Sequence, residues 1–249
     1  MDAVISNPNK VLSTAWLTGL DGILDAYFGV KPQEFTYKER KYSPISFVNY
    51  MDLRLDDYVT IGSFTHHPYY AWFALEIPDN WTWTQTYNIP FEEFLLCMEQ
   101  AISNGYTVLW GADISESGFK YKKGYAIVRA AESIKPEGTD AEKWNGMSKS
   151  EKEKASVDGP SSKEKVITAE LRQKAFDSYE TTDDHGMLIM GLANDSLGTP
   201  YFKVKNSWGT EQLFDGYFYA SYPYVAYKTM NFMVNINALP KALRAKLKR

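Results

Sequence analysis

Residues 184–209 read DHGMLIMGLANDSLGTPYFKVKNSWG, and this stretch decides the fold. It contains two apolar runs, one that follows His185 and one that precedes Asn206. The segment 194–200 between them is made of Asn, Asp, Ser, Leu, Gly, Thr and Pro. Turn-forming residues between two β-prone runs are typical of a hairpin. The stretch therefore predicts two antiparallel strands.

The predicted hairpin brings His185 and Asn206 together. A turn centred between residues 195 and 196 makes them opposite each other, with Cβ atoms about 5 Å apart. The Asn206 side-chain carbonyl can then accept a hydrogen bond from one imidazole nitrogen, which leaves the other nitrogen for a nucleophile. Trp208 follows closely and is expected to cover that hydrogen bond from water. We predict that His185 acts as a base, that Asn206 orients it and that Trp208 supports both.

Each of these residues also has a simpler interpretation. A lone histidine is often satisfied by a backbone carbonyl, a lone asparagine is often a turn residue, and a lone tryptophan is usually part of the core. The presence of His185 and Asn206 at this separation outweighs the first two interpretations, whereas Trp208 fits both readings.

The composition excludes several classes of protein. The chain has 249 residues, with 27 Lys and Arg against 31 Asp and Glu, so its net charge of −4 argues against a nucleic-acid binder with a basic face. Apolar residues make up 44%, enough for a core, and the length fits one large or two small domains. No apolar run approaches the roughly 20 residues of a membrane helix. The first ten residues lack a signal-peptide pattern, so a cytoplasmic protein is expected.

The pattern along the chain predicts a mixed α+β protein. Apolar periodicity, caps and dipole-compatible acidic residues indicate helices, and β-prone runs indicate strands. The expected elements are helices over 13–28, 90–103 and 167–179, short strands and connections over 33–90 with a helix near 46–51, a strand over 106–110, a charged excursion over 132–165, β structure from 187 onward, and a short basic helix or tail over 239–249.

Further motifs accompany the hairpin, and together they resemble one family. The chain is similar to the papain superfamily of cysteine peptidases, within it to the bleomycin hydrolase and aminopeptidase C branch. Cys-His-Asn is a known triad of papain-like proteases. The matching motifs are His185-Gly186-Met187, Asn206-Ser207-Trp208-Gly209, Gly216-Tyr217-Phe218, Leu24-Asp25-Ala26-Tyr27-Phe28-Gly29 with Pro32 and Glu34-Phe35, residues 44–50, Leu55-Asp56-Asp57, residues 104–114 and residues 231–240.

The resemblance implies the later half of the papain-like fold, α+β, with a β-rich barrel-like domain and a helix-containing insertion. Residues 1–105 would be the helical and irregular segment of that insertion, and residues 106–249 the β-rich half with His185 and Asn206. The implied activity is thiol-dependent hydrolysis of peptides, an aminopeptidase or peptidase, without cofactor or metal. Oligomers are common in this branch, so the resemblance is compatible with a homo-oligomer.

The family's nucleophile motif is missing from these residues. Family members carry a Gly-x-Cys-Trp segment and an oxyanion-hole Gln before it, and neither occurs here. The single cysteine, Cys97, lies mid-helix among apolar residues, which favours a buried structural thiol. The expected partner is therefore an N-terminal half that carries the nucleophile, and the isolated chain is expected to be inactive. The alternative is a non-catalytic or partner-dependent module, one fragment of a split or truncated peptidase.

Two other sets of residues suggest metal sites but have simpler interpretations. His66 and His67 are adjacent, and adjacent residues of a strand face opposite sides, so we expect ordinary surface or ring-packed histidines. The pairs 56–57 and 183–184 are both Asp-Asp, but neither has the spacing of a calcium loop, and solvated loops are expected. No phosphate-binding glycine motif is present in the sequence.

Overall fold

The computed structural model describes residue 8, residues 13–130 and residues 163–247. The chain divides into two compact units, Met1–Leu55 and Asp56–Arg249. Residues 56–105 belong to the second unit because their strands join its sheet. The sequence analysis places a different boundary at 105/106, between the expected insertion and the β-rich half. The division into compact units does not test that boundary, which stays a prediction.

The first unit is a helix, a hairpin and a second helix. Its elements are α2 (Ala15–Phe28), β1 (Phe35–Tyr37), β2 (Arg40–Tyr42) and α3 (Pro44–Tyr50). Helix α3 begins sharply because Ser43 and Ser46 form a reciprocal capping box and Pro44 occupies the first turn. Rings from the hairpin and α3 pack together, with Phe47 edge-on to Phe35 and Tyr42.

Helix α2 agrees with the predicted helix over 13–28. It ends at Gly29, whose positive φ of 83° suits a residue without Cβ. None of its side chains is buried. Within the described residues, no helix combines the length and the apolar character that a membrane crossing requires.

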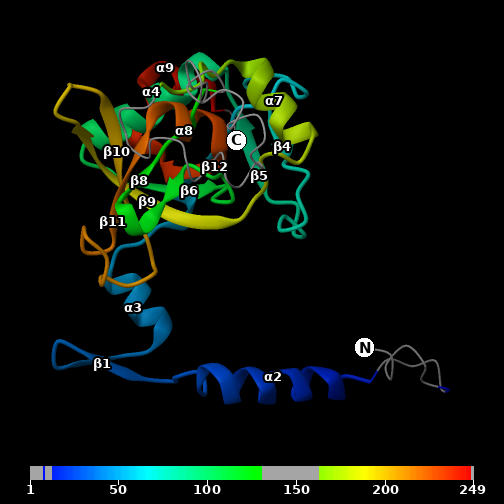
Figure 1. The fold of residues 1–249 in the computed structure, drawn as a ribbon. Coiled ribbons are helices and arrows are strands. Elements are labelled where there is room, and N and C mark those ends of the chain that lie inside the picture. The colour runs from blue at the N-terminus through cyan, green and yellow to red at the C-terminus, as the bar shows by residue number, and fades with distance from the viewer. Residues whose placement is uncertain (1–7, 9–12, 131–162, 248–249) are drawn as a thin grey trace, which may run out of the picture. The chain divides into compact units, whose positions relative to one another are not determined.

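The second unit is built on one large sheet (Figure 1). Among the described residues it has ten strands, in the order β4-β5-β3-β12-β6-β9-β10-β11-β8-β7. The strands are β3 (Tyr58–Gly62), β4 (Trp72–Ala74), β5 (Gln85–Asn88), β6 (Val108–Ala112), β7 (Phe119–Lys120), β8 (Tyr125–Ala126), β9 (His185–Asn194), β10 (Pro200–Lys205), β11 (Tyr217–Ser221) and β12 (Thr229–Asn235).

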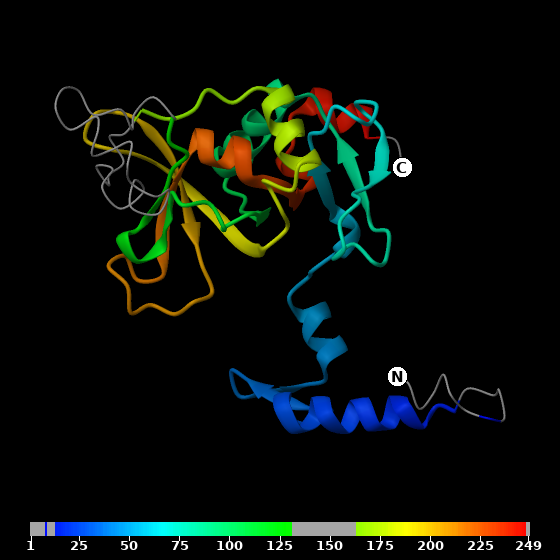
Figure 2. The ribbon, with the colours of Figure 1, turned by 45° about the vertical axis from the view of Figure 1, so that its right-hand side comes forward.

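Helices gather on one side of this sheet (Figures 1 and 2). They are α4 (Phe91–Ser103), α7 (Ala169–Asp177), α8 (Tyr222–Lys228) and α9 (Lys241–Lys246). Short 3-10 turns elsewhere in the chain are η1 (Leu55–Asp57), η2 (Tyr121–Lys123) and η4 (Ile236–Ala238). Helix α4 buries the stripe Phe94, Cys97, Met98 and Ala101 in the main core. The helices predicted over 90–103 and 167–179 and the short basic helix after 239 are all present.

Most of the predicted charged excursion, 132–165, lies outside the described residues. Its last residues, 163–165, are described and contact the second unit. Glu164 forms a β-bridge with Arg129, and its carboxylate accepts a hydrogen bond from the backbone N–H of Val128 at 2.8 Å. Burial raises the pKa of Glu164, while hydrogen bonds from Ser221 and Val128 act in the opposite direction.

Candidate active site

The predicted hairpin forms, and it lies in the middle of the sheet. His185 is the first residue of β9, where it pairs with Ala112 of β6. Asn206 directly follows β10, and its backbone N–H donates to the carbonyl of Gly216 at 3.0 Å. The backbone of His185 is therefore held by a strand outside the hairpin, and that of Asn206 by the residue that precedes β11.

The register of the hairpin differs from the prediction. Pro200 pairs with Asn194, but a bulge at Lys203/Val204 shifts the pairing, so that Lys205 pairs with Leu188. This register places Asn206 across from Met187, two residues away from His185. The two side chains still meet, because they reach diagonally across the strand ends.

The His185 and Asn206 side chains form a hydrogen bond in a defined direction. His185 Nε2 lies 2.8 Å from Asn206 Oδ1. The backbone N–H of Ser207 donates to the same Asn206 atom at 2.7 Å, so that atom must be the amide oxygen. Because an amide oxygen only accepts, His185 carries its proton on Nε2 when neutral. The lone pair of Nδ1 is then left for a proton from another group.

Trp208 covers the imidazole. Its ring centroid lies 4.9 Å from that of His185, with the planes 32° apart. Phe119 and Tyr121 meet Trp208 edge-on at 6.0 and 5.2 Å and hold it in place. Asn206 is 4% exposed, whereas Trp208 is still 50% exposed. Within the described residues, the buried Asn206 Nδ2 has no hydrogen-bond partner.

A groove of about 420 Å³ opens beside His185. One wall comes from the β6 and β9 ends and the other from residues of the 60–86 segment. Asp79 and Asp183 line it, and burial, followed by the negative charges of Asp79 and Asp184, raises the pKa of Asp183. The solvated loop expected at 183–184 is thus correct for Asp184, which is exposed, but Asp183 is half-buried.

A buried ion pair supports the segment that leads into His185. Asp113 is 0% exposed, and its Oδ2 accepts from Lys228 Nζ at 3.2 Å and from the Thr182 backbone N–H at 3.1 Å. Lys228 is also buried, and its Nζ donates to the Glu180 carbonyl at 2.7 Å and lies 3.5 Å from Glu116 Oε2. The sequence does not reveal that Asp113 contacts the segment that leads into His185, since the partners lie 69 to 115 residues apart.

Cys97 is the structural thiol that the sequence predicts. It is free, 1% exposed and part of the main core. Burial, with a smaller contribution from the charge of Glu93, raises the pKa of its thiol to about 12. A thiol with this pKa is protonated at neutral pH and is a poor nucleophile.

His66 and His67 do not lie on a strand, so the argument that they face opposite sides is wrong. They occupy a turn after β3, and both rings approach Glu76. The Asp56–Asp57 pair lies in η1, where Asp56 is exposed and Asp57 is partly buried.

Alanine substitutions at Gly216 and Gly198 test how tightly the segment that follows Asn206 is packed. Gly216 has φ of 86°, and an added Cβ would lie 2.8 Å from the Gly209 carbonyl oxygen. Gly198 has φ of 84° and open space. We expect Gly198→Ala to cost about 1–2 kcal/mol for the left-handed backbone. Gly216→Ala should cost about 2–4 kcal/mol because a steric clash is added. Urea unfolding of both variants measures this difference, and equal losses would contradict it.

Comparisons with known proteins found similarity to part of the sequence and to the fold. Residues 162–249 match the peptidase C1-like family. A 44-residue segment is 50% identical to cathepsin C of Schistosoma mansoni, and it covers 17% of this chain and 10% of that protein. The crystal structure of PepW from Lactobacillus rhamnosis HN001 matches with a TM-score of 0.65 and 20% identity over 94% of this chain.

This chain spans 50% of the length of the PepW chain. A bromelain protease from Ananas comosus, solved with the inhibitor E64, matches at a TM-score of 0.27 and 16% identity, over 55% of this chain and 42% of that one. The resemblance stated from the sequence is confirmed for the fold. The chain has the α+β fold of the PepW crystal structure over 94% of its length, and its residues 162–249 match the peptidase C1-like family.

Proposed function

We propose that this chain supplies the base and its positioning residue for thiol-dependent hydrolysis of peptides, in an enzyme of the bleomycin hydrolase and aminopeptidase C branch. The observation that carries the proposal is the hydrogen bond from His185 Nε2 to Asn206 Oδ1, which leaves Nδ1 free to accept a proton. The groove beside His185 offers space for a peptide. Trp208 shields the hydrogen bond and raises its strength.

The proposed reaction follows from this geometry. His185 Nδ1 takes the proton of a cysteine thiol, and the thiolate attacks the carbonyl carbon of the scissile peptide bond. The imidazolium returns that proton to the leaving amine, and the acyl-thioester is hydrolysed by water that His185 activates in turn. Asn206 holds the ring in one orientation through both steps and does not itself exchange a proton.

The thiol in this proposal belongs to another polypeptide segment. The 249 residues contain one cysteine, and Cys97 is buried with its thiol pKa raised to about 12. A segment with a Gly-x-Cys-Trp motif and an oxyanion-hole Gln would complete the site. Asn206 Nδ2 is buried and has no partner in the part of the chain that the structure describes, which supports this, because an unpaired buried donor costs about 1–3 kcal/mol and an added carbonyl would relieve it.

A partner-dependent module without activity of its own is the second candidate. The first unit favours it, because α2 exposes a set of large apolar side chains, which are Trp16, Leu17, Leu20, Ile23, Leu24, Tyr27 and Phe28. Such a surface is typical of a segment that docks on another chain.

The purified chain alone is expected to show no turnover of aminoacyl fluorogenic substrates, because its only thiol is protonated and buried. Activity is expected when the chain is co-expressed with the gene's own upstream segment, if that segment encodes the Gln and Gly-x-Cys-Trp motifs. The matched control carries Cys→Ala in that motif and should be inactive. N-acylated substrates distinguish an endopeptidase from an aminopeptidase. Turnover by the isolated chain that is lost on His185→Ala would overturn the two-segment proposal.

A further inference from the structure

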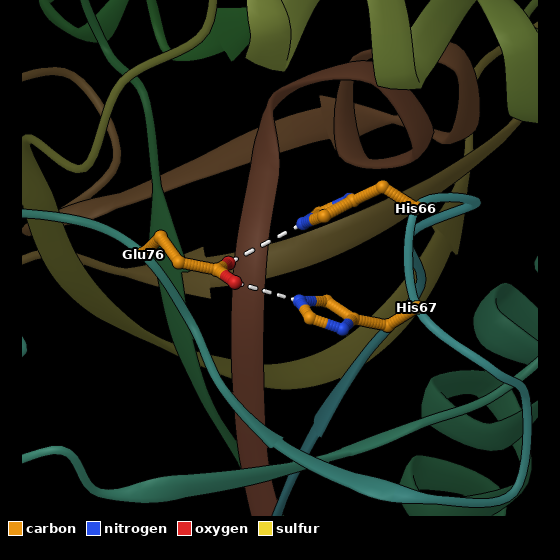
Figure 3. Close-up of side chains that lie close together, drawn as sticks. All are labelled: His66, His67 and Glu76. Carbon is orange, nitrogen blue, oxygen red and sulfur yellow. Dashed lines mark hydrogen bonds and ion pairs between the residues drawn. The ribbon is translucent and has the colours of Figure 1, made fainter.

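Three side chains of the second unit converge outside the groove described above. His66 and His67 lie in the turn after β3, and Glu76 lies two residues after β4 (Figure 3). His66 Nε2 is 3.3 Å from Glu76 Oε2, and His67 Nε2 is 2.7 Å from Glu76 Oε1. One ligand atom of each residue lies within 4.8 Å of the others.

The turn that presents the two histidines is anchored to the core. Asn88 of β5 is 0% exposed, and its Nδ2 donates to the carbonyls of Phe64 and His67 at 2.9 and 3.0 Å. Its Oδ1 accepts from the Phe64 backbone N–H at 2.9 Å. Gln173 of α7 accepts from the Thr65 backbone N–H at 2.7 Å. The turn is therefore fixed by buried hydrogen bonds from a strand and from a helix.

Aromatic contacts fix the direction of both imidazoles. The His66 ring stacks on Phe176 with centroids 5.6 Å apart and an angle of 18°. The His67 ring packs on Phe73 at 4.4 Å. The two imidazoles lie 4.3 Å apart. Packing of this kind limits the rotation of both rings and keeps their Nε2 atoms directed toward the Glu76 carboxylate.

The cluster is accessible to solvent. The side chains of His66, His67 and Glu76 are 31, 26 and 48% exposed. A cavity of about 540 Å³ opens beside them, and Asp79 and Asp183 line it as well as the groove at His185.

We propose that His66, His67 and Glu76 bind a zinc ion, with a fourth coordination position open to solvent. Two imidazoles and one carboxylate are a common set of three protein ligands for zinc. Bonds of about 2.1 Å in a tetrahedron place ligand atoms about 3.4 Å apart, which small rotations of these side chains achieve. Each imidazole would bind the zinc through the lone pair of Nε2, so its ring proton is on Nδ1 in the complex.

Zinc binding to the untagged, full-length chain tests this proposal. Titration against a chromophoric chelator should give one tight zinc per chain. His67→Phe keeps the ring on Phe73 but removes a ligand, and Glu76→Gln removes the charge. Each should weaken the affinity by more than the roughly 10–100-fold that loss of an outer-shell partner costs. The chain has three histidines, so His185→Ala is the matched control and should leave the affinity unchanged.

Cobalt gives an independent readout on the unmodified chain. Co²⁺ in place of zinc should show the intense visible bands of a tetrahedral site, without a thiolate charge-transfer band, since Cys97 is buried. Zinc should also raise the unfolding temperature of the wild-type chain but not of Glu76→Gln. The proposal is overturned if the chain binds no zinc, if His185→Ala abolishes binding, or if binding survives both His67→Phe and Glu76→Gln. The cluster would then be a hydrogen-bonded His-Glu-His group.

Discussion

His185→Ala is expected to abolish turnover by the completed two-segment peptidase. The base would be lost from both the formation and the hydrolysis of the acyl-enzyme, so kcat/KM should fall by roughly 10⁴–10⁶-fold. The thiol would also lose the group that takes its proton. Steady-state kinetics on an aminoacyl fluorogenic substrate measure the loss.

Asn206→Ala and Asn194→Ala provide the matched comparison. Asn206 fixes the Nε2 proton of His185, whereas Asn194 lies exposed at the other end of β9. Asn206→Ala should lower kcat with little change in KM, because it misorients the base without touching the substrate. Asn194→Ala should leave both constants unchanged. Equal effects of the two substitutions, or full activity of His185→Ala, would contradict the assignment of these residues.

Asp113→Ala is expected to lower the free energy of unfolding by about 3–5 kcal/mol, because it leaves the buried Lys228 ammonium without its closest carboxylate. Urea denaturation checks this value. The exposed Asp56→Ala is the control and should lie within about 0.5 kcal/mol of wild type. The double variant Asp113→Asn with Lys228→Met should recover much of the loss, since it removes both charges. A loss no larger than that of Asp56→Ala would contradict the role of the ion pair.

The pH dependence of this effect has a defined sign. Burial raises the pKa of Asp113, but hydrogen bonds from Ser115 and Thr182 and the charge of Lys228 outweigh it, so the pKa is lowered. The contribution of Asp113 is therefore fully present above its unfolded pKa of about 4 and is lost as the pH falls through the lower folded value. The difference between wild type and Asp113→Ala should shrink below about pH 4.

The hairpin could be predicted because the residues that determine it lie close together in the sequence. Turn residues at 194–200 lie between two β-prone runs, and the side chains of His185 and Asn206 meet as expected. The bulge at Lys203/Val204 could not be predicted, because a bulge depends on how both neighbouring strands, β9 and β11, pair with β10.

The groove and the histidine cluster depend on distant parts of the chain. Strand β12 lies between β3 and β6, so residues 58–88 reach the same sheet as His185 only through the C-terminal part of the chain. Periodicity along the sequence does not report such pairing. The sequence predicts a strand at His66 and His67, but Asn88 of β5 donates to the His67 carbonyl and holds this backbone in a turn. A buried amide more than twenty residues away decides that conformation.

The hairpin has one kinetic consequence. Strands β6 and β11 flank the hairpin and fix the His185 imidazole before a cysteine-bearing segment binds. The proton acceptor is therefore already oriented in this chain alone. Binding of that segment would then cost only the entropy of immobilising its own thiol. When this chain is mixed with the cysteine-bearing segment, the lag before turnover should be inversely proportional to their concentration, as for a bimolecular association. A refolding step would instead give a lag that does not depend on concentration.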